Sequence, residues 1–179
     1  MRSNRRVEGH EFPLPAALGT INRHRGVNEW TKEGEHDLSK DARGLGMPWE
    51  DLYGYAQAIR VGDTIYVSGQ LSHDDEGNIV GPAPLNEKGE ILDHSNMETQ
   101  MRQTYANAGK ILGRYGATLQ NVVEEVLYVT DMNAAFSAAG PVRKKAYASE
   151  RSAVASTIVT TSRLALPTQL IEIKFTARV

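Results

Sequence analysis

The last ten residues of the chain, 170–179, alternate between two kinds of side chain. One series is apolar and consists of Ile171, Ile173, Phe175 and Ala177. The other is mixed and consists of Leu170, Glu172, Lys174 and Thr176. Because successive side chains of a strand point to opposite faces, this period of two predicts a β-strand with one face on a core. The apolar face suits covering helices, and the mixed face suits a partner or a binding site.

Two helices are expected to cover that sheet. Apolar residues recur every three or four positions between residues 96 and 116, which is the spacing of one helix face. The series is Met97, Met101, Tyr105, Ala108, Leu112 and Tyr115, with Ser95 or Asn96 as N-cap and Gly116 as the end. In the second helical region, 134–148, Gly140 and Pro141 interrupt the pattern. Pro141 is therefore placed in the first turn of a helix that runs to about Ser149.

Four further strands are predicted. Segments 56–61 and 64–69 form a hairpin around the Gly62-Asp63 turn. Segment 121–131 is a nearly continuous apolar run, as expected of a strand covered on both faces, and 157–162 is the next strand. Residues 72–96 are expected to hold a second short strand pair within a long loop. This order favours an α+β fold, a sheet with both helices on one face.

The other face of the sheet is expected to meet another subunit. Ile65, Val67 and Leu170 are assigned to this face, which is therefore not uniformly polar. An uncovered apolar face of this kind is typical of an interface. We expect a closed oligomer.

The chain divides into two regions of different character. Residues 1–52 show no sustained period and are expected to form an irregular arm, part of which packs on the folded surface. Residues 53–179 form the domain.

Composition limits the classes of function. Twenty basic and 22 acidic residues give a net charge of −2, which argues against nucleic-acid binding. No apolar run is long enough to span a membrane, residues 1–13 lack the apolar core of a secretory signal, and cysteine is absent, so we expect a cytoplasmic protein. His73, Asp74 and Asp75 lie in a Gly/Asn-rich loop and are interpreted as a solvated turn, so no metal site is expected.

Five segments match one known family in the correct order: Tyr55–Ala58, Tyr66–Gln70, Gln100–Leu112 with Gly116–Val123, Tyr128–Met132, and Arg163–Leu164 through Pro167 to Ile171–Ile173. Residues 53–179 resemble the Rid family of reactive intermediate deaminases, also called YjgF or L-PSP proteins. The resemblance implies a chorismate-mutase-like α+β fold, a homotrimer, and ligand sites in the clefts between subunits. It also implies hydrolysis of a C=N bond to a keto acid and ammonia without a metal or organic cofactor.

The resemblance assigns roles to individual positions. Tyr55 matches the tyrosine of the family site and Glu172 its glutamate, which acts as a general base toward water. The position of the family asparagine falls near Gly140. The position of the arginine that binds the substrate carboxylate falls on Ser156, and Arg151 reaches that position only with an insertion of five residues.

With a serine at position 156, it is open which residue binds the substrate carboxylate, because a hydroxyl cannot replace a guanidinium charge. Either the ligand lacks an α-carboxylate, or another cation such as Arg60, Arg151 or Arg163 reaches the cleft, or the protein binds without catalysis. Arg143-Lys144-Lys145 is interpreted as a solvated helix face.

Three functions compete. The first is deamination or tautomerisation of a small imine or enamine, with Glu172 and Tyr55 in the site. The second is a non-catalytic module that binds or senses a metabolite in the same cleft. The third is endoribonuclease activity, which the acidic balance and the lack of a basic aromatic platform disfavour.

Overall fold

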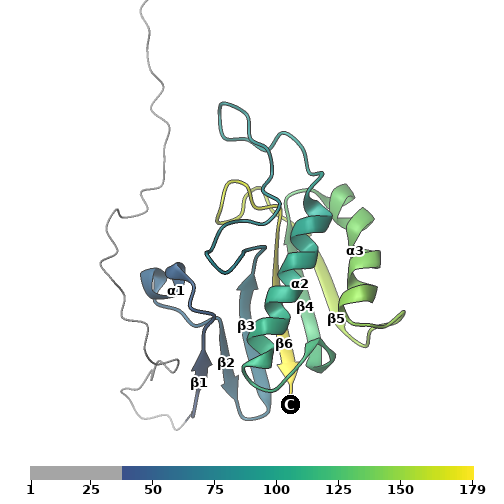
Figure 1. Ribbon diagram of the computed structural model, residues 1–179. Helices are drawn as coiled ribbons and strands as arrows, with labels where there is room; N and C mark the ends of the chain where they lie inside the picture. The colour runs from purple at the N-terminus through teal and green to yellow at the C-terminus, as the bar shows by residue number, and fades with distance from the viewer. Residues whose placement is uncertain (1–37) are drawn as a thin grey trace, which may run out of the picture.

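The computed structural model describes residues 38–179, in which two long helices cover one face of a six-stranded sheet (Figure 1). The elements are β1 (Asp41–Arg43), α1 (Pro48–Tyr53), β2 (Ala58–Val61), β3 (Thr64–Gln70), α2 (Met97–Gly113), a 3-10 turn (Leu119–Asn121), β4 (Val122–Val129), α3 (Met132–Ala146), β5 (Ala155–Thr160) and β6 (Ile171–Arg178). The strand order is β1-β2-β3-β6-β4-β5, and only β4 and β5 run parallel. The expected α+β fold with a mixed sheet is confirmed.

The core lies between the sheet and α2 with α3. Ile171, Ile173, Phe175 and Ala177 of β6 are all buried, as their alternation predicts. Residues of the expected stripe on α2, from Met97 to Leu112, are buried against them. The hairpin is also confirmed, since Gly62 and Asp63 join β2 to β3 and Gly62 adopts a φ of 59°.

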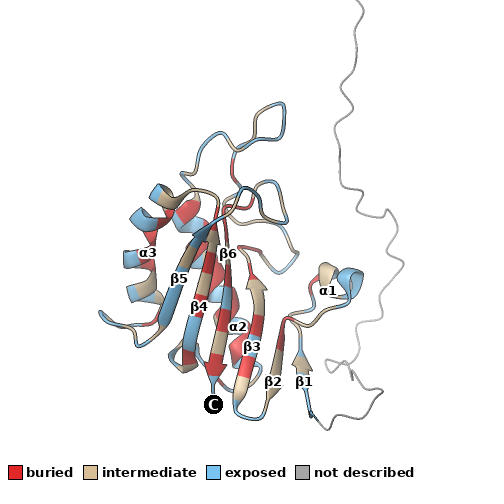
Figure 2. Cartoon of the chain, turned by 180° about the vertical axis from the view of Figure 1, so that it is seen from behind, coloured by how far each residue is buried: buried red, intermediate tan, exposed pale blue. Residues whose placement is uncertain are grey.

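The residues expected on the open face of the sheet lie on the other face. Ile65 and Val67 pair with the inward residues Ala177 and Phe175, and all four are buried. Leu170, just before β6, is also fully buried. The register between β3 and β6 decides this, because paired residues share a face. The open face instead carries Tyr66, whose exposed fraction is 46%. Figure 2 views the sheet from this face, with α2 behind the strands.

The central strand β4 has one buried face in the protomer. Leu127 and Val129 are fully buried. Val126 and Tyr128 lie on the open face and are half-buried. The prediction of cover on both faces is therefore not met within residues 38–179.

Helix α3 is continuous across Pro141, contrary to the expectation of an interruption. It begins after Asp131, whose Oδ1 accepts a hydrogen bond from the backbone N–H of Ala134 at 2.7 Å. A proline inside a helix costs about 3 kcal/mol relative to alanine. Burial of the small residues Ala135, Ala138, Ala139 and Val142 on the sheet side offsets that cost, and Pro141 itself is exposed.

Two further segments differ in detail from the expected pattern. The end of the stretch expected to be irregular contains β1, which pairs with β2, and α1. Residues 1–37 lie outside the described residues. The second strand pair is reduced to two isolated bridges, His73 with Ile79 and Leu85 with Ile91.

Buried amides of α2 hold the loops at one end of the sheet. Gln100 donates from Nε2 to the carbonyls of Gly81 and Thr168 at 2.8 and 2.9 Å, and its Oε1 accepts from the N–H of Leu170. The loop that leads into β6 is therefore fixed to the helix. In residues 38–179 no helix has the length and hydropathy needed to cross a membrane.

Candidate functional site

Glu172 lies on the open face of β6, opposite Tyr128 of β4. It is only partly exposed. Burial raises the pKa of its carboxyl group, and a hydrogen bond from Gln169 Nε2 at 3.2 Å opposes that rise. A carboxylate with a raised pKa is a stronger base, so this group is suited to accept a proton from water.

The carboxylate of Glu172 rests against the backbone of Gly69, at the irregularity in β3 between Val67 and Gln70. A Cβ atom at residue 69 would stand 2.0 Å from Glu172 Oε1 and 2.6 Å from its Cδ. Any residue larger than glycine must therefore displace this carboxylate. The group that approaches Gly69 closely is therefore a side chain.

Tyr55 belongs to the same site. It follows Gly54, which ends α1 with a φ of 66° and turns the chain toward β2. Burial, together with the charges of Glu50 and Glu172, raises the pKa of Tyr55 to about 12. The phenol therefore keeps its proton near neutral pH and can donate a hydrogen bond. Because the charge of Glu172 acts on this phenol, the two residues assigned to catalysis from the sequence lie near each other.

Ser156 lies on the opposite face of the sheet from Glu172 within one protomer. It stands beside Glu125 in the parallel pairing of β5 with β4, and Glu125 is fully buried on the helix side. The Ser156 hydroxyl accepts a hydrogen bond from Arg143 Nη2 at 2.7 Å. A guanidinium therefore does stand at position 156, and α3 supplies it.

A buried carboxylate holds this guanidinium. Arg143 Nε donates to Glu125 Oε1 at 2.6 Å, and the hydroxyls of Tyr105 and Tyr147 donate to Glu125 Oε2 at 2.8 and 2.9 Å. Burial lowers the pKa of Arg143, but the charges and hydrogen bonds of Glu125 and Tyr105 together outweigh it, so the net shift is upward. Burial, reinforced by Glu125, raises the pKa of both tyrosines. The side chain of Arg143 is 25% exposed, so part of the cation remains accessible.

The other predicted binding residues do not converge on Ser156. Gly140 lies on the exposed side of α3, where an added Cβ would meet no atom within 4 Å. Arg151 is exposed in the loop before β5, and its N–H donates to Ser149 Oγ. Arg163 is exposed beyond β5, where its carbonyl accepts from Thr161 Oγ1.

Sequence reasoning missed Arg143 and Glu125. Arg143 was assigned to a solvated helix face, but it points to the sheet. One signal was available: Glu125 shares its alternation with Leu127 and Val129, which places a carboxylate on the buried side of the strand. A buried carboxylate requires a cation or several donors. The sequence did not indicate which cation.

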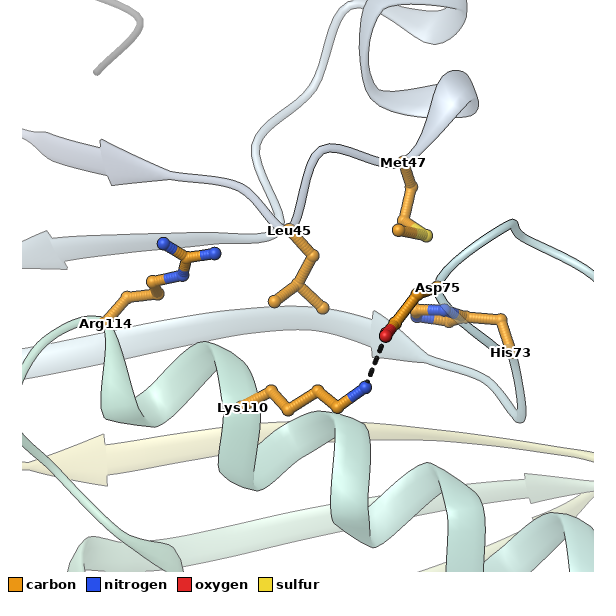
Figure 3. Close-up of a pocket in the computed structure, with 6 residues that line it drawn as sticks. All are labelled: Leu45, Met47, His73, Asp75, Lys110 and Arg114. Atoms are coloured by element: carbon orange, nitrogen blue, oxygen red, sulfur yellow. Dashed lines mark hydrogen bonds and ion pairs between the residues drawn. The ribbon is translucent and has the colours of Figure 1, made fainter. Parts of the chain in front are cut away.

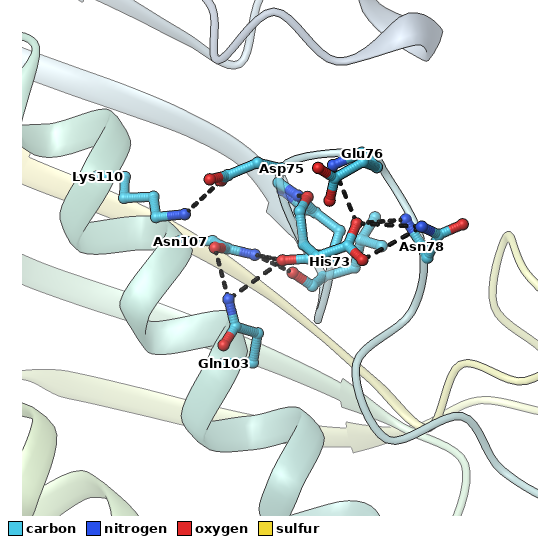
Figure 4. Close-up of polar contacts among 9 residues, drawn as sticks. His73, Asp75, Glu76, Asn78, Gln103, Asn107 and Lys110 are labelled. Carbon is cyan, nitrogen blue, oxygen red and sulfur yellow. Dashed lines mark hydrogen bonds and ion pairs between the residues drawn. The ribbon is translucent and has the colours of Figure 1, made fainter.

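The turn expected at His73, Asp74 and Asp75 is present from Asp74 onward, but His73 is not solvated, because it is buried and forms a bridge with Ile79. The carbonyl of His73 accepts hydrogen bonds from Gln103 and Asn107 of α2 (Figure 4). Asp74 Oδ1 accepts from the N–H groups of Glu76 and Asn78 at 3.0 and 2.8 Å. Within residues 38–179 no three His, Cys, Asp or Glu side chains are placed to hold a metal ion.

Known proteins are similar to this chain in sequence. A family model described as Endoribonuclease L-PSP matches residues 50–179. A RutC family protein of Pyrococcus abyssi is 38% identical over 80 residues, 44% of this chain and 53% of the relative. A 2-iminobutanoate/2-iminopropanoate deaminase of Capra hircus is 33% identical over 95 residues, 53% of this chain and 60% of the relative. The matched residues span little more than half the length of these curated relatives.

Solved structures agree on the fold. A member of the YjgF/YER057c/UK114 family from Mycobacterium tuberculosis has a TM-score of 0.61 at 26% identity, covering 79% of this chain and all of that one. A Rid family protein of unknown function from Yersinia pestis has a TM-score of 0.64 at 23% identity, with the same coverage of both chains.

Proposed function

Because this chain belongs to the L-PSP family, also called YjgF or Rid, we propose that it hydrolyses the C=N bond of a small imine or of its enamine tautomer. The observation that carries the proposal is the carboxylate of Glu172, half-buried on the open sheet face against Gly69, with its charge acting on the phenol of Tyr55. The relatives named as 2-iminobutanoate/2-iminopropanoate deaminases support the reaction class.

The reaction needs only a general base and an oriented substrate, because an iminium carbon is already electrophilic. Glu172 takes a proton from water as the water oxygen bonds to that carbon. The proton then passes to the nitrogen of the resulting carbinolamine. The C–N bond breaks, ammonia leaves, and a carbonyl forms. Water enters and ammonia leaves, so the reaction balances without a redox partner.

Tyr55 is assigned to orient the substrate. Its hydroxyl remains protonated at neutral pH because its pKa is about 12. A hydrogen bond from this hydroxyl to the imine or to the attacking water fixes the reacting atoms relative to Glu172. Such positioning lowers the barrier, because the reacting groups are already aligned when the substrate is bound and lose little further entropy in the reaction step.

Arg143 is assigned to bind an anionic group of the substrate. It stands at Ser156, where the family arginine is missing, and Glu125 fixes its orientation. Since Ser156 and Glu172 lie on opposite faces of one sheet, Arg143 of one protomer completes the site of another. This arrangement requires the expected homotrimer with ligand sites between subunits. The exposed Tyr66, Val123 and Val159 supply apolar contact area for that assembly.

The test is ammonia release from freshly generated 2-iminobutanoate and from a neutral imine, beside an arginine-bearing relative as positive control. Glu172→Gln is expected to lower kcat about 100-fold or more. The matched control Glu124→Gln, on the open face of the neighbouring strand, is expected to keep wild-type activity. Arg143→Gln is expected to raise KM for 2-iminobutanoate about tenfold and to leave the neutral imine unaffected.

Two results would decide against catalysis. If the wild-type chain releases no ammonia above background from either compound while the relative is active, the deaminase proposal fails. If it then still binds the product 2-oxobutanoate in a way that depends on Arg143, the non-catalytic binding module is the better description.

A further inference from the structure

A pocket lies beside α2, on the helix side of the sheet (Figure 3). Glu172 lies on the opposite, open face. Its volume is about 370 Å³, within the range of pockets that hold small metabolites. The lining residues come from three segments, and they are Leu45, Met47, His73, Asp75, Lys110 and Arg114. Leu45 and Met47 precede residues 50–179, so the family match does not include this wall.

Each wall of the pocket is fixed by hydrogen bonds. Glu50 Oε1 accepts from the N–H groups of Leu45 and Met47 at 2.9 and 3.0 Å. The carbonyl of His73 accepts from Asn107 Nδ2 at 3.0 Å and from Gln103 Nε2 at 3.1 Å (Figure 4). The pocket is therefore preformed, and little ordering entropy opposes binding.

The charge in the pocket is unbalanced. Lys110 lies on α2, and Arg114 is the residue that caps the end of this helix four positions later, so both side chains leave from the same side of it. Lys110 Nζ pairs with Asp75 at 2.7 Å, but these side chains are 47% and 82% exposed, so the pair is worth at most about 1 kcal/mol. Within residues 38–179 the guanidinium of Arg114 has no hydrogen bond or ion pair. One positive charge is left for a ligand.

The remaining surface is apolar or neutral. Leu45 and Met47 lie on the side of the pocket away from Lys110, and Leu45 lies between the ends of the Arg114 and Lys110 side chains (Figure 3). His73 is 2% exposed, and its Nδ1 is 2.8 Å from the carbonyl of Asp74, so Nδ1 holds the proton in the neutral ring. The Nε2 atom is then a hydrogen-bond acceptor.

We propose that this pocket binds a small organic anion with a short aliphatic body, its carboxylate on the guanidinium of Arg114 and its alkyl group against Leu45 and Met47. This site is separate from Glu172 and does not depend on the proposed deamination. Asp75 lines the same pocket, so its negative charge opposes the bound anion.

Calorimetric titration of the full chain at low ionic strength tests the proposal, with 4-methylpentanoate, 4-methylpentanamide and inorganic phosphate as probes. The acid is expected to bind more tightly than the other two. Arg114→Gln is expected to weaken binding of the acid about tenfold or more. Asp75→Asn is expected to tighten it about two- to fivefold, because the pocket loses a negative charge that opposes the anion. The matched control Arg102→Gln removes a cation from the same helix and is expected to change nothing.

Three outcomes would overturn the proposal. The amide binding as tightly as the acid would exclude recognition of the anion. Phosphate binding as tightly as the acid would exclude a role for the apolar wall. Binding that is lost in Arg143→Gln and kept in Arg114→Gln would assign the titration to the Glu172 site.

Discussion

Replacing Gly69 by alanine should separate catalysis from folding. The new Cβ would stand 2.0 Å from Glu172 Oε1, whereas real Cβ contacts essentially never fall below 3.0 Å, so the carboxylate must move by about 1 Å or more. The obstructing atoms belong to the outer part of a flexible side chain, and φ of Gly69 is not positive. The backbone therefore accepts alanine once Glu172 turns away.

The two effects differ in size. Displacing a catalytic group by about 1 Å costs on the order of 100-fold in rate. The free energy of unfolding should change by less than about 1 kcal/mol, because neither a cavity nor a buried unpaired charge is created. Gly109→Ala on α2 is the matched control, since an added Cβ there meets no atom within 4 Å.

Ammonia release from 2-iminobutanoate and urea unfolding, measured on both variants, decide the matter. Gly69→Ala should lose about 100-fold in kcat/KM at nearly unchanged stability, and Gly109→Ala should keep wild-type activity. Wild-type kcat/KM in Gly69→Ala would refute the assignment of Glu172 as the base. A decrease of more than about 1 kcal/mol in the free energy of unfolding of Gly69→Ala would refute the claim that only the side chain moves.

Three other predictions concern stability and are measured by urea unfolding. The pKa of Glu172 is raised in the folded state, so ionisation of its carboxyl group destabilises the fold as pH rises above the ordinary value of 4.5. Glu172→Gln should therefore be more stable than wild type near pH 7. This gain in stability should vanish below pH 4.5. Glu125→Ala should cost about 3–5 kcal/mol, because Arg143 and two tyrosines lose their shared acceptor, whereas Glu124→Ala should change little. Pro141→Ala should stabilise α3 by about 1–3 kcal/mol, and a loss of stability would show that the ring itself contributes packing.

Local patterns in the sequence predicted the elements that form the sheet and its main helix. The alternation in 170–179 and the apolar stripe of α2 are visible in the sequence because each follows from the geometry of a single element. The Gly62-Asp63 turn is local in the same way. Tyr55 and Glu172 were assigned from the family resemblance, and their catalytic roles stay predictions.

Two features of the fold depended on contacts between segments distant in sequence. The face taken by Ile65 and Val67 was decided by the register of β3 against β6, which the period within β3 does not fix. The persistence of α3 through Pro141 was decided by burial of its alanine face, since local propensity alone favours a break.

The sequence by itself determined that this chain forms a one-sided sheet with a carboxylate, Glu172, on the face away from the helices. Only the tertiary structure decided which cation stands at Ser156. Arg143 and Ser156 are 13 residues apart on different elements, and the buried Glu125 on a third element orients the guanidinium. Such a contact depends on packing across three elements, and no periodicity in the chain encodes it.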